Sequence, residues 1–162
     1  MTFLGLQHCK VYIFDDALIM SGANLSADYF EARQDRYVLV EDCPALADYY
    51  EQLIGTVALF SLRMDENINF SASPAFTSHP FEKDIQDFVA KSNEKMRSFM
   101  EDAQKAYCVN EEDLRHSGDD GDVDTEMDTW IFPSVQMGPL EVHQDSQLTE
   151  QILRSGQPGG PI

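Results

Sequence analysis

The order of apolar and polar residues over the first forty positions predicts a small sheet. Residues 3–14 end in the apolar run Val-Tyr-Ile-Phe, residues 17–20 form a second run, and residues 36–40 form a third. Runs rich in branched and aromatic residues are typical of strands, and the Asp15-Asp16 pair between the first two predicts a turn. The third run is apolar at successive positions, which predicts a strand buried on both faces.

Other segments carry the spacing of helices. A short helix is expected to start near Leu25, with Asn24 or Ser26 as its cap. Apolar residues recur every three or four positions in 44–57 and in 80–107, which predicts two amphipathic helices, the second with Pro80 in its first turn. A further short helix is expected over 146–154.

Strands that alternate with helices indicate an α/β chain with helices flanking a mixed sheet. We expect residues 1–64 to form an α/β half-domain and residues 65–110 to form a loop without periodicity, over 65–80, followed by the long helix. Residues 111–128 are strongly acidic and predict a solvated, disordered loop. Residues 129–154 should begin a second half with a strand over 129–135 and a helix, and residues 155–162 should form a loose tail.

The charge of the chain limits the classes of partner that it can bind. Its 29 acidic residues against 11 basic ones give a formal net charge of −18, which repels nucleic acid backbones unless a local patch reverses the sign. We therefore expect no nucleic acid partner. The longest apolar run, residues 53–62, is too short to span a bilayer, and no cleavable signal is evident at the start.

Cysteine and acidic residues do not form a metal pattern in this sequence. Cys9, Cys43 and Cys108 are far apart and predict reduced thiols. The acidic loop contains alternating aspartates from Asp120 to Asp124, but it lacks the glycine and the final glutamate of a calcium loop. No metal site is expected.

The candidate chemistry lies in the string His8-Cys9-Lys10. Side chains alternate across a strand, so His8 and Lys10 should share one face. A neutral imidazole can attack phosphorus and form a phosphohistidine, and an ammonium group beside it offsets the charge that develops on the phosphoryl oxygens. The pair therefore predicts phosphodiester chemistry.

Several residues near this pair are candidates for supporting roles. The returning strand leads to Ser21, Gly22 and Asn24, where Gly22 lets the backbone approach a phosphate and the Asn24 amide can bind an oxygen. Asp35, at the start of the next strand, is the candidate carboxylate that orients the histidine. Asp15 points away from the pair or lies in the turn, which favours a structural role.

The spacing of these residues resembles the H-K-D motif of the phospholipase D superfamily. His8, Lys10 and Asp15 fall on the motif histidine, lysine and aspartate, Asn24 falls on the motif asparagine, and Asp35 on the orienting acid. The wider likeness covers most of residues 2–150. It is carried by the strings Gly5-Leu-Gln-His-Cys-Lys-Val-Tyr-Ile-Phe-Asp15, Ser21-Gly-Ala-Asn-Leu-Ser26, Tyr29-Phe30, Arg33-Gln-Asp-Arg-Tyr37 and Asp128-Thr-Trp-Ile-Phe-Pro133.

Within the superfamily the chain is most similar to mitochondrial enzymes that make phosphatidylglycerophosphate. This resemblance implies transfer of a phosphatidyl group from CDP-diacylglycerol to glycerol 3-phosphate with release of CMP, a step toward cardiolipin. It implies a mitochondrial location, catalysis without a cofactor or metal, and a partial phospholipase D-like α/β domain. Peripheral contact with the mitochondrial inner membrane stays open.

One departure from the superfamily is plain, because its members bring two H-K-D motifs together and this chain has one. None of His79, His116 and His143 has a lysine two residues further on. We therefore expect an incomplete domain holding half of an active site, with the second half missing or supplied by another chain. Two alternatives remain: a homodimeric phosphodiesterase or nuclease, and an inactive truncated isoform that acts by protein interaction. Whether His8 attacks or protonates also stays open.

Overall fold

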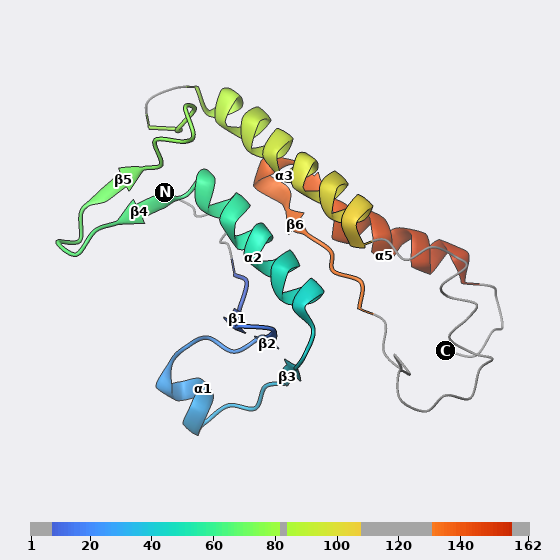
Figure 1. The fold of residues 1–162 in the computed structure, drawn as a ribbon. Helices are drawn as coiled ribbons and strands as arrows, with labels where there is room; N and C mark the ends of the chain where they lie inside the picture. The colour runs from blue at the N-terminus through green and yellow to red at the C-terminus, as the bar shows by residue number, and fades with distance from the viewer. Residues whose placement is uncertain (1–7, 82–83, 108–130, 157–162) are drawn as a thin grey trace, which may run out of the picture.

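The computed structural model describes residues 8–81, 84–107 and 131–156 (Figure 1). These residues form an α/β structure, as predicted. The expected acidic loop 111–128 lies outside the described residues, as does the tail beyond Gly156. The described elements are, in order, β1 (Val11–Phe14), β2 (Ala17–Ser21), α1 (Ala27–Glu31), β3 (Tyr37–Val40), α2 (Pro44–Leu59), β4 (Leu62–Met64), β5 (Phe70–Ala72), α3 (Ile85–Tyr107), β6 (Gln136–Met137), the 3-10 helix η1 (Gly138–Leu140), β7 (Val142–His143) and α5 (Gln144–Ser155).

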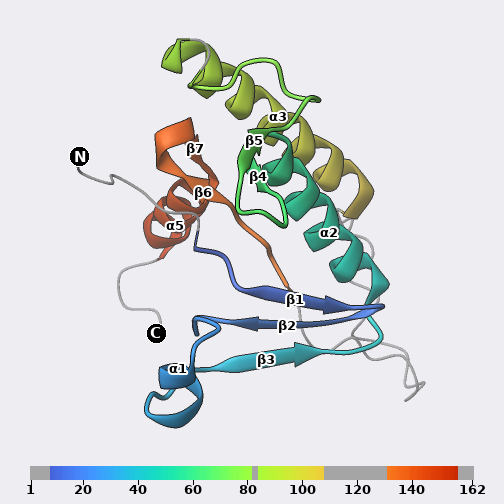
Figure 2. The same cartoon turned by 90° about the vertical axis from the view of Figure 1, so that its left-hand side faces the viewer.

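The predicted sheet at the start of the chain is confirmed in part: its first strand, expected over residues 3–14, begins at Val11, so His8 and Lys10 precede the strand rather than lie on one face of it. Strands β1, β2 and β3 pair in that order, both pairs antiparallel, and α1 lies beyond one end of the sheet (Figure 2). Phe14 pairs with Ala17, so the turn between β1 and β2 has two residues. Asp15 takes a left-handed conformation there, with φ of 51°, which an aspartate tolerates better than most residues.

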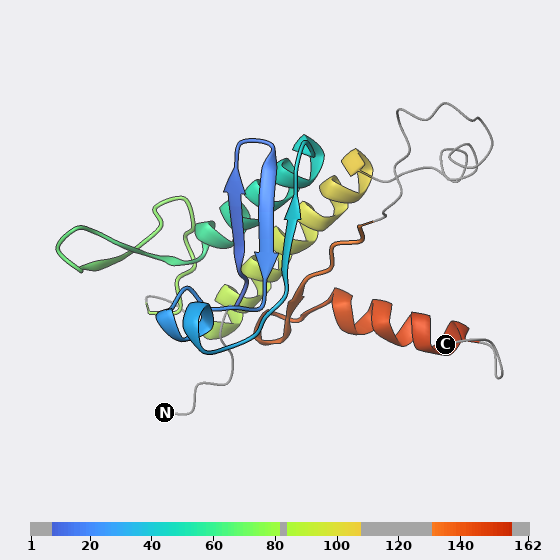
Figure 3. The same ribbon diagram turned by 90° about the horizontal axis from the view of Figure 1, so that it is seen from below.

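Among the described residues, helices cover one face of this sheet. Leu18 is completely buried on the face that packs against α2, and Val40 pairs with it from β3. Leu39 points to the opposite face and is 57% exposed, and Figure 3 shows no described element over that face. The prediction that residues 37–40 are buried on both faces is therefore wrong, because β3 is an outer strand of a sheet covered on one side.

Helices α2 and α3 pack together on the covered side of the sheet. Their apolar stripes meet around Tyr49 and Phe99, whose ring centroids are 5.3 Å apart. The long helix begins at Ile85 rather than at Pro80. The carboxylate of Asp84 accepts a hydrogen bond from the Gln86 backbone N–H at 3.1 Å and so satisfies a free donor of the first turn.

A hairpin stands where the sequence predicts an unpatterned loop. Strands β4 and β5 pair antiparallel across residues 65–69. The Asp65 carboxylate accepts hydrogen bonds from the backbone N–H groups of Asn67 and Asn69 at 2.9 and 2.8 Å, and these bonds hold the pKa of Asp65 below its usual value. The turn is thus built by one side chain on polar, non-periodic residues, which is why hydrophobic periodicity missed the hairpin.

The C-terminal part pairs later than expected. Residues 129 and 130 lie outside the described residues, and 131–135 form no strand, so the predicted strand is wrong over that range. Val135 instead donates its backbone N–H to the Gln144 side chain at 2.9 Å, and pairing begins at Gln136. The predicted helix over 146–154 is confirmed as α5. No helix among the described residues is both long and apolar enough to cross a bilayer.

The contrast between the two sheet faces predicts different costs for the same substitution. Leu18→Ala should lower the free energy of unfolding by about 2–5 kcal/mol, because it opens a cavity against α2. Leu39→Ala should change it by less than about 0.5 kcal/mol, since the side chain is mostly in solvent. Urea unfolding of the two variants measures both values, and equal costs would contradict the one-sided packing of the sheet.

Candidate active site

The predicted histidine and lysine line a cleft of about 460 Å³. The cleft lies where the residues before β1, the end of β2, helix α2 and the segment 134–137 come together. Its lining comprises His8, Cys9, Lys10, Val11, Met20, Ser21, Tyr50, Leu53, Val57, Ser134, Val135, Gln136 and Met137. A volume of this size falls in the range of about 300–1,000 Å³ that is usual for small-molecule sites.

Hydrogen bonds to backbone carbonyls hold the His8–Lys10 segment that lines the cleft. The Lys10 ammonium donates to the His8 backbone carbonyl at 3.0 Å, and the Ser21 N–H donates to the Lys10 carbonyl at 3.3 Å. The His8 side chain is exposed, and its ring has no hydrogen-bond partner among the described residues. Its nitrogens therefore stay available to a ligand, with the lysine two positions away on the same cleft.

A tight turn at Ser21 and Gly22 follows β2, and the Asp35 carboxylate binds it from another part of the chain. The Ser21 hydroxyl accepts the Ala23 N–H at 3.0 Å, and one Asp35 carboxylate oxygen accepts the N–H groups of Gly22 and Arg36 at 3.3 and 2.7 Å. A Cβ atom on Gly22 would lie 3.1 Å from that oxygen. Gly22 therefore allows close approach of Asp35, and this carboxylate binds backbone rather than the His8 ring.

Two predicted residues lie away from the cleft lining. Asp15 occupies the turn between β1 and β2, after the end of β1, whereas His8 precedes the start of that strand. Asn24 is exposed, and its backbone carbonyl accepts the Ser26 N–H at 2.8 Å. The structure thus brings His8, Lys10 and Ser21 together, whereas Asp15, Gly22, Asn24 and Asp35 do not line the cleft.

Sequence reasoning missed the opposite wall, which residues 134–137 provide. The Ser134 hydroxyl donates to the Asp145 carboxylate at 2.8 Å, and the Asp145 N–H donates to the Val135 carbonyl at 3.4 Å. The Gln136 side chain lies 3.3 Å from the His143 ring nitrogen Nδ1. These bonds tie the wall to the start of α5. These hydrogen bonds cannot be predicted from local sequence patterns, because they are tertiary contacts.

Tyr50 was also missed, since its place in an apolar stripe predicts a core residue. Tyr50, on α2, lines the cleft, and so does Cys9, which precedes β1. Cys9 is exposed as a residue, but partial burial of its thiol raises the pKa of that thiol, and the positive charge of Lys10 partly offsets this rise. Burial also raises the pKa of the Tyr50 hydroxyl, and a negative charge on Cys9 would raise it further. Both groups are therefore neutral near pH 7.

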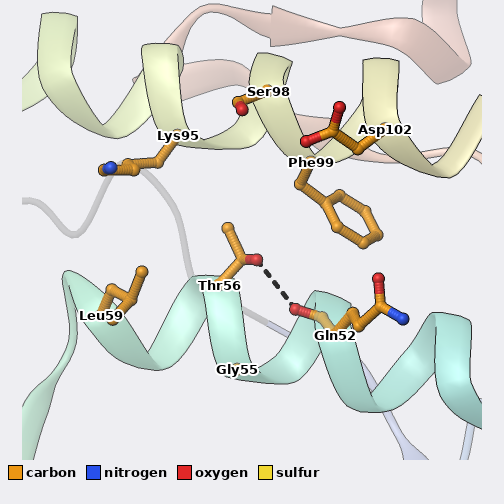
Figure 4. A pocket seen from close by; sticks show the side chains of 8 residues that line it. All are labelled: Gln52, Gly55, Thr56, Leu59, Lys95, Ser98, Phe99 and Asp102. Atoms are coloured by element: carbon orange, nitrogen blue, oxygen red, sulfur yellow. Dashed lines mark hydrogen bonds between the residues drawn. The ribbon is translucent and has the colours of Figure 1, made fainter.

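A second hollow, between α2 and α3, contains none of the predicted site residues (Figure 4). It has a volume of about 430 Å³ and is lined by Gln52, Gly55, Thr56, Leu59, Lys95, Ser98, Phe99 and Asp102. Thr56 uses its hydroxyl to donate to the Gln52 backbone carbonyl at 2.8 Å. Across the described ranges, no group of three or more histidine, cysteine, aspartate or glutamate residues is placed to hold a metal ion.

Nearly the whole chain is similar to one part of a set of longer proteins. It is 35% identical over 171 residues to the Bos taurus protein named CDP-diacylglycerol–glycerol-3-phosphate 3-phosphatidyltransferase, mitochondrial, a match that covers 98% of this chain and 30% of that protein. The Homo sapiens protein of the same name is 33% identical over 168 residues, with the same coverage. A Dictyostelium discoideum protein, named as a probable enzyme of this kind, is 34% identical over 94% of this chain and 26% of its own length.

The chain therefore spans about three-tenths of the length of the curated relatives it matches. No family model and no solved structure matches it. The similarity makes the chain a homologue of one segment of these proteins.

The surroundings of Gly22 and Gly55 predict that substitution by alanine has opposite effects on stability at the two positions. Gly22→Ala should lower the free energy of unfolding by about 1 kcal/mol, because the new methyl group displaces a carboxylate held by two backbone N–H groups. Gly55→Ala, where a Cβ meets no atom within 4 Å, should stabilise α2 by about 0.4–1 kcal/mol. Urea unfolding tests both, and the cost of Gly22→Ala should shrink in an Asp35→Ala background.

The raised pKa of Cys9 predicts a shifted alkylation profile. In a Cys43→Ser, Cys108→Ser background, iodoacetamide should label Cys9 with a half-maximal rate at higher pH in the folded chain than in urea, because burial disfavours the thiolate. Lys10→Ala should move the folded profile to still higher pH. A folded profile at or below the unfolded one would contradict this environment for the thiol.

Proposed function

We propose that this chain carries half of the catalytic site for phosphatidyl transfer from CDP-diacylglycerol to glycerol 3-phosphate. The products are phosphatidylglycerophosphate and CMP, and the location is mitochondrial. One observation carries the proposal: His8 and Lys10, which resemble half of a two-histidine phosphodiester site, open on one cleft. Its support from comparison is the similarity of nearly the whole chain to proteins named for this reaction.

The chemistry assigns the pair clear roles. With His8 as nucleophile, an imidazole nitrogen forms a bond to the phosphorus that bears diacylglycerol, and the bond from that phosphorus to the CMP oxygen breaks. A hydroxyl oxygen of glycerol 3-phosphate then attacks the phosphorus, its proton passes to the histidine of the other half, and the phosphorus–nitrogen bond breaks to free the His8 imidazole. With His8 as the acid–base partner, the attacking histidine belongs to the other half. In both cases Lys10 stabilises charge on the phosphoryl oxygens.

The second histidine is the feature that this proposal requires from elsewhere. A second copy of the chain or a different chain would have to present it across the cleft from His8. A homodimeric phosphodiesterase of the same superfamily is the second candidate function, and it differs in using water rather than glycerol 3-phosphate. The exposed His8 ring favours either arrangement, because a partner histidine can reach the same phosphorus atom.

A transfer assay tests the proposal. Where a second copy of the chain supplies the second histidine, we expect the purified chain to convert labelled glycerol 3-phosphate to a lipid-soluble product in the presence of CDP-diacylglycerol micelles. His8→Ala and Lys10→Ala should each reduce the rate at least about 100-fold, through loss of acid–base or nucleophilic catalysis and of charge stabilisation. Lys105→Ala is the matched control, because that lysine is exposed on α3 and pairs with Asp102 at 3.4 Å.

The mass of the chain in solution, measured by light scattering, resolves the source of the second half. Transfer by a dimer places the second histidine on another copy, and release of phosphatidic acid in place of transfer favours the phosphodiesterase. If the folded chain catalyses neither reaction at any concentration, the proposal fails for this chain by itself. Retained activity in His8→Ala would remove the role of this histidine.

A further inference from the structure

We infer that the cleft beside His8 and Lys10 binds the hydrocarbon part of a phosphate ester, and that Leu53, Val57 and Met137 form its binding surface. The inference deepens the proposed function and rests on it for the phosphate, which His8 and Lys10 would hold. What it adds is the part of the substrate that enters this cleft: an alkyl chain rather than a nucleoside.

The lining of the cleft combines two kinds of side chain. His8, Lys10 and Ser21 bring the charged and polar groups of the motif. Met20 on β2, Leu53 and Val57 on α2, and Met137 on β6 bring apolar surface. A ligand that fills the cleft would therefore meet both charge and hydrocarbon.

The apolar walls are both exposed to a ligand and firmly supported. Leu53, Val57 and Met137 are only half-buried, and each packs from behind against the core formed by α2, α3 and the C-terminal segment. Apolar surface that is left open on a rigid base gains free energy when hydrocarbon covers it, by about 25 cal/mol for each Å² removed from water. A fixed wall also loses little conformational entropy on binding.

The polar groups on the far wall are already engaged. The Ser134 hydroxyl donates a hydrogen bond to the Asp145 carboxylate. The Gln136 side chain contacts His143, and its amide oxygen accepts a hydrogen bond from the Ser146 N–H at 3.4 Å. A nucleoside base would need free donors and acceptors at that wall, whereas an alkyl chain needs none. The engaged groups therefore favour hydrocarbon over a base.

The charge of the lining fits an anionic head group. The chain has a net charge of −18, yet no aspartate or glutamate is among the residues that line this cleft, and Lys10 is. A local reversal of sign in an acidic protein concentrates an anion at that point. Charge and hydrocarbon together specify an amphipathic phosphate ester.

Binding of n-alkyl phosphates to the full chain tests this inference. Butyl, hexyl and octyl phosphate, each below its micelle concentration, are titrated by calorimetry alongside inorganic phosphate. We expect the affinity to rise about two- to fourfold for each added methylene, as burial of hydrocarbon predicts. Leu53→Asn and Met137→Gln should flatten this rise and leave the affinity for inorganic phosphate unchanged.

Leu59→Asn is the matched control, because Leu59 is also a half-buried leucine on α2 but lines the groove between α2 and α3. It should keep the full dependence on chain length. Circular dichroism establishes that each variant is folded, and the two cleft variants on separate elements protect the test against one that is not.

The outcomes separate the inference from the proposed function. An affinity that does not depend on chain length overturns the inference, as does a dependence that survives both cleft variants. If chain-length dependence is lost in the cleft variants alone, the inference stands. If Lys10→Ala then leaves the affinity for every alkyl phosphate unchanged, the phosphate site of the proposed function fails while the hydrocarbon site remains.

Discussion

The packing of α2 between the sheet and α3 is the interaction on which the rest of this structure depends. Helix α2 contacts β1 and β2 on one side and α3 on the other. Tyr49 lies at its centre, with ring centroids 5.2, 5.3 and 6.3 Å from those of Tyr50, Phe99 and Tyr107. Burial raises the pKa of Tyr49 to about 12, so its hydroxyl stays neutral across the physiological range. One helix thus supplies part of the core and one wall of the cleft.

Local sequence patterns predicted those helices and turns that are determined by interactions between neighbouring residues. The stripe through Met96, Phe99 and Ala103 identified the long helix, and the aspartates after Phe14 identified the first turn. The failures occurred where a single side chain or a tertiary contact decides the structure. Asp65 folds polar residues into a hairpin, and the burial of the third strand depends on what lies above the sheet, which its own residues do not encode.

The residues of the candidate site fall into the same two groups: some could be predicted from local spacing, and others depend on tertiary contacts. His8 and Lys10 line one cleft, but both precede β1, so the strand alternation from which their common face was predicted is absent there. The placement of Asp35 also differs from the prediction, because its carboxylate satisfies the turn at Gly22. The wall at 134–137 and the contribution of Tyr50 could not be read from the sequence, since each depends on packing between segments distant in the chain.

Because the two sides of the cleft are far apart in the sequence, their separation affects when the site forms during folding. The cleft needs the residues before β1 and the wall at 134–137, so the chain must close a long loop before the cavity exists. Long closures cost entropy that is recovered only when the final contacts form, and such contacts come late in folding. Early hairpins and helices can therefore assemble while the cleft is still absent. A cut between α3 and β6 would remove this covalent link, and formation of the cleft would then depend on the concentration of the two pieces.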